Sequence, residues 1–359
     1  MPGFKSIIDQ KQPVLLLKTL FIKGSLPHAL LFTGIDGVQK LSTAIALAML
    51  CNCEKINSSQ TIPFRLGKTG AKEVRLDIDS CGTCRSCRKI QSDNHPDIIH
   101  VKPSGNLIKI DQIRSLCNSL ALKPYEADTR VIIISNAQTM NPEASNALLK
   151  ILEEPPDKTL LILIALQALD LLTTIISRCQ QIRFNPIQAS SIAKHLIQEK
   201  KMTQDKAGLY AALSGGSFSR ALKINKKWLR QRDWILTAPG LNRSNRQALP
   251  SVLKCLAFAE KLTKSKALVP LSLEILQTWL RDLIIFPYIP DKINNIDLIN
   301  QIDQISRNTE RATLLSKLDA VLEAAKNLQA NTNLKLTLEI MALKLGGFSD
   351  PGIQEMEIN

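Results

Sequence analysis

Short apolar runs alternate with helical patterns along the first half of the chain. The runs are typical of buried strands because each is brief and lacks polar alternation; they cover 28–33, 97–101, 130–137 and 159–166. Helical spacing of apolar residues is found at 40–52, 111–122 and 142–154. Strand–helix alternation with unbroken apolar strands indicates a parallel sheet that helices cover on both faces. The first half is therefore predicted to be an α/β domain.

Two of these helices carry start signals. Asp111 is expected to cap the helix over 111–122, because its carboxylate can accept a hydrogen bond from a first-turn N–H group. Pro142 falls near the start of the helix over 142–154. Proline is tolerated there because an N–H group in the first turn has no hydrogen-bond partner within the helix.

Strand signals stop at about residue 185, and helical patterns dominate the rest of the chain. Short helical patterns come first, with a break at Gly215 and Gly216. Two amphipathic stretches follow at 313–330 and 333–347, the second stopped by glycines. The predicted order is an α/β domain, a small helical domain and a larger helical domain. Their boundaries are placed at 1–185, 186–238 and 239–350, with a tail at 351–359.

Length and composition fit a soluble globular protein of two or three domains. The chain has 359 residues, of which 45% are apolar and 22% charged. No run of about eighteen apolar residues lacks polar breaks, so no membrane span is expected. The N-terminus lacks the apolar core and cleavage site of a secretory signal, and we expect the protein to stay in the cytoplasm.

The net charge of +14 makes nucleic acid a natural partner to consider. The excess is concentrated in residues 221–270, which hold eleven Lys or Arg and two acids. Two interpretations stay open for this stretch. It is either a solvated basic surface of helices or a surface that attracts the phosphates of DNA.

The segment after the first strand has the position of a phosphate-binding P-loop. Such a loop needs glycines for close backbone approach, a Lys against the phosphates and a hydroxyl for Mg²⁺. Gly34, Gly37 and Lys40 fit this pattern between a strand and a helix. A generic α/β loop with no nucleotide ancestry is the simpler alternative.

The residues that would carry the metal chemistry are missing. Gln39 stands where the second glycine belongs, so its Cβ would crowd the phosphates and any positive φ would be strained. Leu41 replaces the metal-binding hydroxyl, and Ser42 is one position too late. The strand over 131–134, which an ATPase would end in an acidic pair, continues into Ser135-Asn136. The pattern is typical of a non-hydrolysing relative of an ATPase.

Eight cysteines include three at two successive C-x-x-C spacings, Cys81, Cys84 and Cys87. This spacing lets thiolates converge on one zinc ion, which takes four ligands in a structural site. Cys51 and Cys53 are both candidates for the fourth, and Cys53 is preferred because it follows the helix over 40–52. A redox C-x-x-C is the less favoured alternative. Residues 54–80 are predicted to form a polar surface loop.

Ser177 and Arg178 precede Cys179 after the last predicted strand. Arg178 is either a surface residue before a buried cysteine or an arginine finger, which donates to phosphate charge on an adjacent subunit. The residues alone leave both interpretations open.

Taken together, these segments resemble the delta-prime family of bacterial DNA polymerase III clamp-loader subunits, within the AAA+ superfamily. The resemblance covers nearly the whole chain. It rests on SLPHALLFTG (25–34), Cys53 with CGTCRSC (81–87), NHPDIIHV (94–101), IKIDQIRSL (108–116), NPEASNALLKILEEPP (141–156), IISRCQQIRF (175–184), SGGSFSRAL (214–222), WLRDLII (279–285) and ANTNLKLTLE (330–339).

The resemblance implies an AAA+ sheet domain with a zinc insertion over 53–87, a helical lid and a helical collar. The collar joins gamma/tau and delta subunits in a hetero-pentamer that loads a sliding clamp onto primer–template DNA. In this family Arg178 would be the finger that completes the ATP site of a gamma/tau neighbour, beside Ser177. Cys53 would be the fourth zinc ligand, since it lies thirteen residues after Lys40.

Lys40 and Arg220 match the P-loop lysine and the second sensor of the lid, and both are expected to be relics. ATP binding by this chain is not expected. The chain departs from the family pattern in its long 54–80 segment and in Ala165-Leu166, where relatives often have Ser-Asn. Two other functions are an ATP-hydrolysing subunit of the gamma/tau kind and a zinc protein that binds DNA alone. The first lacks its metal ligand and acids, and the second has few basic residues near the cysteines.

Overall fold

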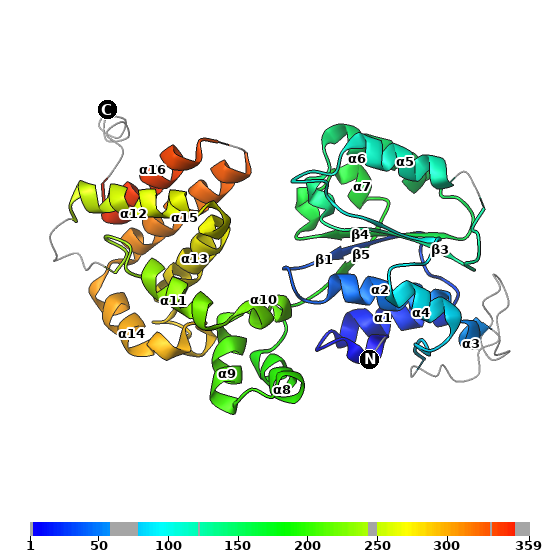
Figure 1. Cartoon of the computed structure of the whole chain (residues 1–359), viewed down its shortest axis with the longest axis horizontal. Helices are drawn as coiled ribbons and strands as arrows, with labels where there is room; N and C mark the ends of the chain where they lie inside the picture. The colour runs from blue at the N-terminus through cyan, green and yellow to red at the C-terminus, as the bar shows by residue number, and fades with distance from the viewer. Residues whose placement is uncertain (1–2, 58–77, 121–122, 243–249, 331, 349–359) are drawn as a thin grey trace. The chain divides into compact units, whose positions relative to one another are not determined.

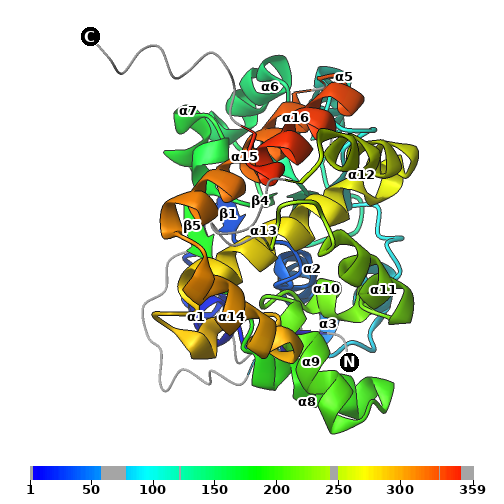
Figure 2. The ribbon, with the colours of Figure 1, turned by 90° about the vertical axis from the view of Figure 1, so that its left-hand side faces the viewer.

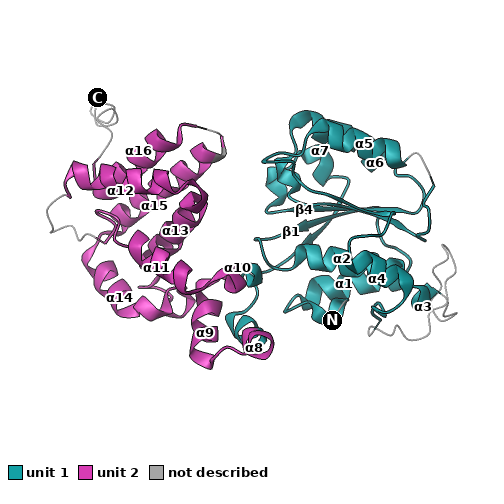
Figure 3. Cartoon of the chain, in the orientation of Figure 1, with its two compact units in different colours: residues 1–195, 216–219 teal, residues 196–215, 220–359 magenta. Residues whose placement is uncertain are grey.

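The computed structural model describes residues 3–57, 78–120, 123–242, 250–330 and 332–348 (Figure 1). The chain divides into two compact units (Figure 3). Unit 1 contains residues 1–195 and 216–219, and unit 2 contains 196–215 and 220–359. The boundaries predicted at 185 and 238 stay predictions. The predicted surface loop at 54–80 falls mostly on 58–77, outside the described residues, as does the tail at 351–359.

Unit 1 is built on a five-stranded parallel sheet with the order β2-β3-β4-β1-β5. The strands are β1 (Ala29–Thr33), β2 (Ile98–Val101), β3 (Arg130–Ile134), β4 (Thr159–Ala165) and β5 (Gln180–Arg183). Every residue of β1, β3 and β4 is buried, which explains why these segments have no polar alternation. In register, Leu31 of β1 lies opposite Leu163 of β4.

Helices cover both faces of this sheet (Figure 1). On one side lie α1 (Lys11–Ile22), α2 (Lys40–Cys51) and α4 (Arg85–Gln91), and on the other α5 (Ile110–Leu120), α6 (Pro142–Glu153) and α7 (Thr173–Ile176). The second group packs on β1, β3 and β4 in one apolar core, to which Ile113, Leu148 and Ile175 contribute from the helices. The prediction of a parallel sheet covered on both faces is confirmed.

One predicted cap is wrong, and one start signal is confirmed. Helix α5 begins at Ile110, so Asp111 lies inside its first turn and not at the cap. A carboxylate there still faces the positive end of the helix dipole. Helix α6 begins at Pro142 as predicted, and the Asn141 side chain before it accepts a hydrogen bond from Ala144 N–H at 3.0 Å.

All the regular secondary structure in the described residues of unit 2 is helical. Its helices are α9 (Gln204–Leu213), α11 (Lys226–Ile235), α12 (Val252–Lys264), α13 (Val269–Ile285), α14 (Ile299–Asn308), α15 (Arg311–Gln329) and α16 (Leu334–Gly346). Helix α13 lies in the centre, with α11, α14 and α15 packed against it (Figure 2). Trp279 of α13 is fully buried there, and its indole N–H donates to Asn242 Oδ1 at 2.8 Å.

The remaining helices are short or shared between the units. Helices α8 (Ala189–Lys200) and α10 (Phe218–Lys223) run across the boundary, and α3 (Glu54–Asn57) follows α2. The 3-10 helices are η1 (Phe4–Ser6), η2 (Ala137–Thr139), η3 (Ala168–Asp170), η4 (Lys266–Leu268), η5 (Pro290–Lys292) and η6 (Ile296–Leu298). None of the helices built from described residues has the length and apolar character that crossing a bilayer requires.

Candidate functional site

The P-loop-like turn lies where the sequence predicts it, between β1 and α2. Gly34 has a φ of 144°, and a Cβ at this position would come within 2.5 Å of the Phe184 carbonyl oxygen. Its N–H donates to the Leu166 carbonyl at 3.0 Å, beyond the end of β4. Glycine at this position is therefore required by close approach of the protein's own backbone.

Gln39 occupies the left-handed region, with φ 67° and ψ 28°. This is the backbone conformation for which a P-loop uses glycine, and a side chain there costs roughly 1–2 kcal/mol. The Gln39 Oε1 accepts a hydrogen bond from the Ile8 N–H at 2.6 Å. The predicted positive φ is present, and the side chain is used to hold the N-terminal segment.

Lys40 is turned back on its own loop. Its ammonium group donates to the carbonyl oxygens of Gly34 and Ile35, the latter at 3.0 Å, and its side chain is only 5% exposed. Burial lowers the pKa of Lys40, and the Asp36 carboxylate, 3.9 Å away and exposed, partly opposes this shift. The ammonium group that a P-loop offers to phosphate thus donates here to carbonyl oxygens of its own loop.

The positions of the metal ligands carry no carboxylate or correctly placed hydroxyl. Leu41 is an exposed alkyl group at the first turn of α2. After β3, the Ser135 hydroxyl lies 2.7 Å from His100 Nε2, and Asn136 has a φ of 54° where η2 begins. Burial, with Lys102 nearby, lowers the pKa of His100. Ser135 and Asn136 therefore stand where an ATPase has the acidic pair that holds Mg²⁺ and activates water.

Gly37 makes a tight contact with a later segment of unit 1. A Cβ at this position would lie 2.2 Å from Ser217 Oγ and 2.3 Å from Ser219 Oγ, and its φ is 81°. Its carbonyl accepts a hydrogen bond from the Phe218 N–H at 3.0 Å. Glycine at position 37 therefore serves packing within the chain, which the sequence pattern did not predict.

Arg220, the second-sensor match, is engaged within unit 2. Its guanidinium forms an ion pair with Glu274 of α13 and donates to the Ser214 carbonyl at 3.2 Å. Gly215 lies between Ser214 and Arg220 in the sequence. A Cβ at this position would lie 3.3 Å from the Arg220 guanidinium. The arginine therefore fixes the turn before α10.

Arg178 lies between α7 and β5, on the surface of unit 1. Its guanidinium donates to Glu153 Oε1 at 2.7 Å and to the Thr174 carbonyl at 3.0 Å, with Ser177 Oγ at 3.5 Å. The side chain is 36% exposed. Glu153, at the end of α6, is a partner that sequence reasoning missed, because no local spacing links residues 25 positions apart.

Cys53, Cys81, Cys84 and Cys87 form a cluster in which all four sulfur atoms lie within 4.8 Å of one another. Cys53 follows α2, and the other three lie before and in the first turns of α4. A tetrahedral site with metal–sulfur bonds of about 2.3 Å needs sulfurs roughly 3.8 Å apart. The four side chains fit this requirement, so the cluster could hold a metal ion such as zinc.

Backbone N–H groups point at the sulfur atoms of this cluster. Thr83 and Cys84 donate to Cys81 Sγ at 3.4 and 3.3 Å, and Cys81 itself donates to Cys53 Sγ at 3.4 Å. Burial alone would raise the pKa of Cys81, but the N–H groups of Thr83 and Cys84, with the Thr83 hydroxyl and the Cys53 thiol, bring it to about 6. At Cys81 these contacts favour thiolate, the form that binds metal, whereas burial raises the pKa of Cys53 and of Cys87. A closed set of four ligands is typical of a structural site.

Cys51 is not part of the cluster. It is buried in the last turn of α2, and burial raises the pKa of its thiol to about 12. Of the two candidates that the spacing left open, the structure brings Cys53 to the other three.

Asp97 supports the region beside the cysteines and was not predicted as a functional residue. Its carboxylate accepts hydrogen bonds from the N–H groups of Tyr125, Glu126 and Ala127 at 2.8–2.9 Å, and Arg130 lies 3.6 Å away. Burial would raise the pKa of Asp97, but these donors and the guanidinium outweigh it and hold the pKa below its usual value. The residue therefore fixes the loop before β3.

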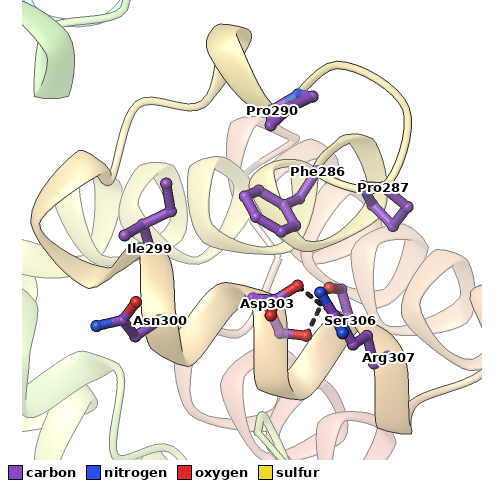
Figure 4. Close-up of a pocket in the computed structure, with 8 residues that line it drawn as sticks. All are labelled: Phe286, Pro287, Pro290, Ile299, Asn300, Asp303, Ser306 and Arg307. Carbon is purple, nitrogen blue, oxygen red and sulfur yellow. Dashed lines mark hydrogen bonds and ion pairs between the residues drawn. The ribbon is translucent and has the colours of Figure 1, made fainter.

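Unit 2 contains a separate hollow of about 560 Å³ between the end of α13 and α14 (Figure 4). Phe286, Pro287 and Ile299 line it, and Arg307 donates to Asp303 at 2.7 Å along one side. None of the residues predicted to bind nucleotide or metal lies in it. The hollow has no evident part in the chemistry considered above.

The parallel sheet, the P-loop-like turn after β1 and the helical second unit define an AAA+ protein. The family model described as "DNA polymerase III, delta subunit" matches residues 9–188, and "DNA polymerase III, delta subunit, C terminal" matches 247–346. DNA polymerase III subunit delta' of Bacillus subtilis is 30% identical over 94% of this chain and 96% of its own. The chain belongs to the delta-prime family of DNA polymerase III clamp-loader subunits, as the sequence motifs predicted.

Two further relatives match this chain over different shares of their own length. Subunit delta' of Pseudomonas aeruginosa is 29% identical over 90% of this chain and 93% of its own. DNA polymerase III subunit tau of Escherichia coli K12 is 26% identical over 74% of this chain, but this match covers only 38% of tau. The delta' relatives, unlike tau, correspond to this chain over nearly their whole length.

Proposed function

We propose that this chain is the clamp-loader subunit that does not hydrolyse ATP and that acts on a neighbouring ATP site. It would supply Arg178 in trans to a gamma/tau subunit and so help to load a sliding clamp onto primed DNA. The observation that carries the first part is the position of Lys40, whose ammonium group is held by the Gly34 and Ile35 carbonyls. A triphosphate would have to displace both contacts at a site that offers no metal ligand in return.

The case for Arg178 rests on its exposure and on its chemistry. The guanidinium is anchored through Thr174 and Glu153, and a third of the side chain remains open to solvent. Arginine stays ionised and presents a planar fork of donors, which suits contact with phosphate charge that develops during transfer. The pair with exposed Glu153 is weak in water, so a phosphate group of higher charge can replace the carboxylate.

Zinc is the metal that suits the cysteine cluster best. Four thiolates with no open position make a structural site, which zinc fills in tetrahedral geometry. The ion would join the end of α2 to the segment before α4 and so fix both segments on the sheet. Four reduced cysteines fit a reducing compartment, and we place the protein in the cytoplasm.

The partners follow from the same proposal. Gamma/tau and delta subunits would complete a hetero-pentamer, with the helices of unit 2 as the collar. The whole assembly would bind the clamp and the primer–template DNA. A gamma/tau-like ATPase is the alternative, and the relation to tau is its support. It requires a metal ligand at position 41 and an acid at 135 or 136, and the residues there are Leu41, Ser135 and Asn136.

The decisive experiment is equilibrium binding of labelled ATP with Mg²⁺ to the isolated chain, followed by addition of gamma/tau and delta. We expect no saturable binding and no turnover by the chain alone. We also expect turnover in the mixture to rise above that of gamma/tau and delta without it. Steady ATP hydrolysis by the isolated chain would contradict the proposal outright.

A further inference from the structure

Helices α11 and α12 of unit 2 meet at an aromatic side chain that lies beneath a lysine. The ammonium group of Lys261 lies 4.6 Å from the centre of the Trp234 ring. The same indole packs on Phe258, with ring centres 5.3 Å apart. The exposed surfaces of the two helices are therefore continuous at this point.

Further cations lie on the same faces. Arg230 precedes Trp234 by four residues and Lys227 by seven, so both lie on the Trp234 side of α11. Lys254 precedes Lys261 by seven residues on α12. All four cationic side chains are exposed; along the helix axis, Lys227 and Arg230 are about 4.5 Å apart and Lys254 and Lys261 about 10 Å apart. We call Lys227, Arg230, Lys254 and Lys261 the α11–α12 strip.

No ion pair is found between a carboxylate and the strip among the residues that the structure describes. The two acids on these helices are already paired, Asp233 with Arg232 at 3.1 Å and Glu260 with Lys264 at 2.9 Å. Within the part of the chain that the structure describes, none of the four strip residues forms an ion pair. The other cations of 221–270 include Arg243 and Arg246, which lie outside that part.

The chemistry of the strip favours phosphate over a protein partner. Lysine is depleted at protein–protein interfaces, whereas protein–DNA interfaces are strongly positive. The aromatic residues are not free for base stacking, because Trp234 is covered by Phe258 and Lys261, and Trp228 packs on the core. Single-stranded DNA binding relies on such stacking, so this surface fits the backbone of a duplex better.

We propose that the α11–α12 strip binds the phosphate backbone of duplex DNA without sequence preference. Each cation that neutralises a phosphate releases condensed counterions, and this makes the affinity fall with salt. This interaction requires nothing from Arg178 or from the nucleotide chemistry, so it holds or fails independently of the function proposed above.

The test measures fluorescence anisotropy of a labelled DNA duplex with the full chain over a range of salt concentrations. In the strip variant, all four residues of the strip are changed to Gln, which keeps much of their aliphatic length. We expect the slope of log K against log salt to become shallower by about 0.9 for each cation removed, about 3.6 in total. Zinc content and the urea unfolding midpoint check that the variant is folded.

The matched control removes the same charge from exposed lysines on other elements: Lys23→Gln, Lys109→Gln, Lys194→Gln and Lys206→Gln. We expect its slope to stay within about one unit of the parent's, since at most one of these residues would contact phosphate. Equal changes in both variants would mean that only net charge matters and would overturn the proposal. Labelled single-stranded DNA and polyglutamate are measured in the same way. The proposal is also overturned if the parent protein does not bind duplex DNA, whether or not it binds either of these two probes.

Discussion

The Gln39 side-chain oxygen and the Ile8 backbone N–H are joined by a hydrogen bond of 2.6 Å. The bond connects the P-loop-like turn to the segment before α1. Asp9 and Gln10 extend this connection, because they bond the backbone of Gln188 and Asn185 beyond β5. The loop that cradles phosphate in an ATPase is here tied to the N-terminal segment.

Two substitutions of Gln39 should distinguish how much the hydrogen bond and the backbone strain each contribute to the free energy of unfolding. Gln39→Ala loses the bond to Ile8 and keeps φ near 67°, so we expect a loss of about 1–2 kcal/mol in the free energy of unfolding. Gln39→Gly also loses the bond but adopts this φ freely, and it should be roughly 1 kcal/mol more stable than the Ala variant. Urea unfolding measures both; equal losses would mean that position 39 stores no strain.

Restoring the P-loop residues should not restore hydrolysis. A Gln39→Gly and Leu41→Thr double variant regains the flexible backbone and the metal hydroxyl. It still lacks an acid at Ser135 or Asn136, so no group is available to activate water. We expect ATP turnover equal to the parent's background in a steady-state assay. Turnover well above background would show that the missing acids are not the barrier.

Loss of the Arg178 guanidinium should lower the rate of ATP hydrolysis at the neighbouring subunit. In a reconstituted loader, Arg178→Ala should lower hydrolysis at the adjacent ATP site by about a thousandfold. Glu153→Gln is the matched control, because it breaks the same ion pair and leaves the arginine in place. This exposed pair contributes at most about 1 kcal/mol, so the control should fold and hydrolyse normally. Single-turnover assays resolve the affected site; normal rates with Arg178→Ala would exclude the finger role.

The cysteine cluster should hold one zinc ion per chain, and Cys53 should be required for it. Cys53→Ser should lower zinc affinity and stability because a closed tetrahedral site loses a thiolate. Cys51→Ala should retain one zinc, since Cys51 is buried outside the cluster as a protonated thiol. Metal analysis after dialysis against a chelator distinguishes the two variants. Zinc lost from Cys51→Ala and kept by Cys53→Ser would reverse the ligand assignment.

Asp97 should make stability depend on pH in acid. Its pKa is held below the usual 3.8, so the stabilisation is complete above that value and is lost as pH falls through the folded-state pKa. Asp97→Asn should cost roughly 2–3 kcal/mol at neutral pH, because its amide cannot accept all three N–H groups. The difference from the parent should shrink in acid. Urea unfolding at neutral pH and at about pH 3 tests this; a constant difference would contradict it.

The sequence predicted the buried elements well, because burial leaves a strong pattern. Strands β1, β3 and β4 are wholly buried and were placed to within one or two residues, apart from the extension of 130–137 past Ile134. Strand β5 was missed, since only Ile182 of its four residues is buried at the edge of the sheet. Helix α4 was missed because it has only seven residues, and its two buried residues, Cys87 and Ile90, are too few to set up a helical period.

At the candidate site, the sequence predicted which metal-binding groups are absent. It did not predict the contacts that the remaining side chains make. The missing hydroxyl and acids could be read from Leu41, Ser135 and Asn136 alone. The contacts of Lys40 with its own loop, and of Arg178 with Glu153, depend on how the chain folds back on itself. Such contacts join residues with no shared periodicity, so only the three-dimensional structure reveals them.

The contacts that anchor Arg178 have a consequence for assembly. A long side chain usually loses rotamer freedom when it docks on a partner, at about 0.5–1.5 kcal/mol. Here the Thr174 carbonyl, at 3.0 Å, accepts a hydrogen bond from the guanidinium within the chain itself. On the function proposed above, this contact would meet part of the ordering cost while the chain folds, whereas the weak pair with Glu153 would be given up to phosphate.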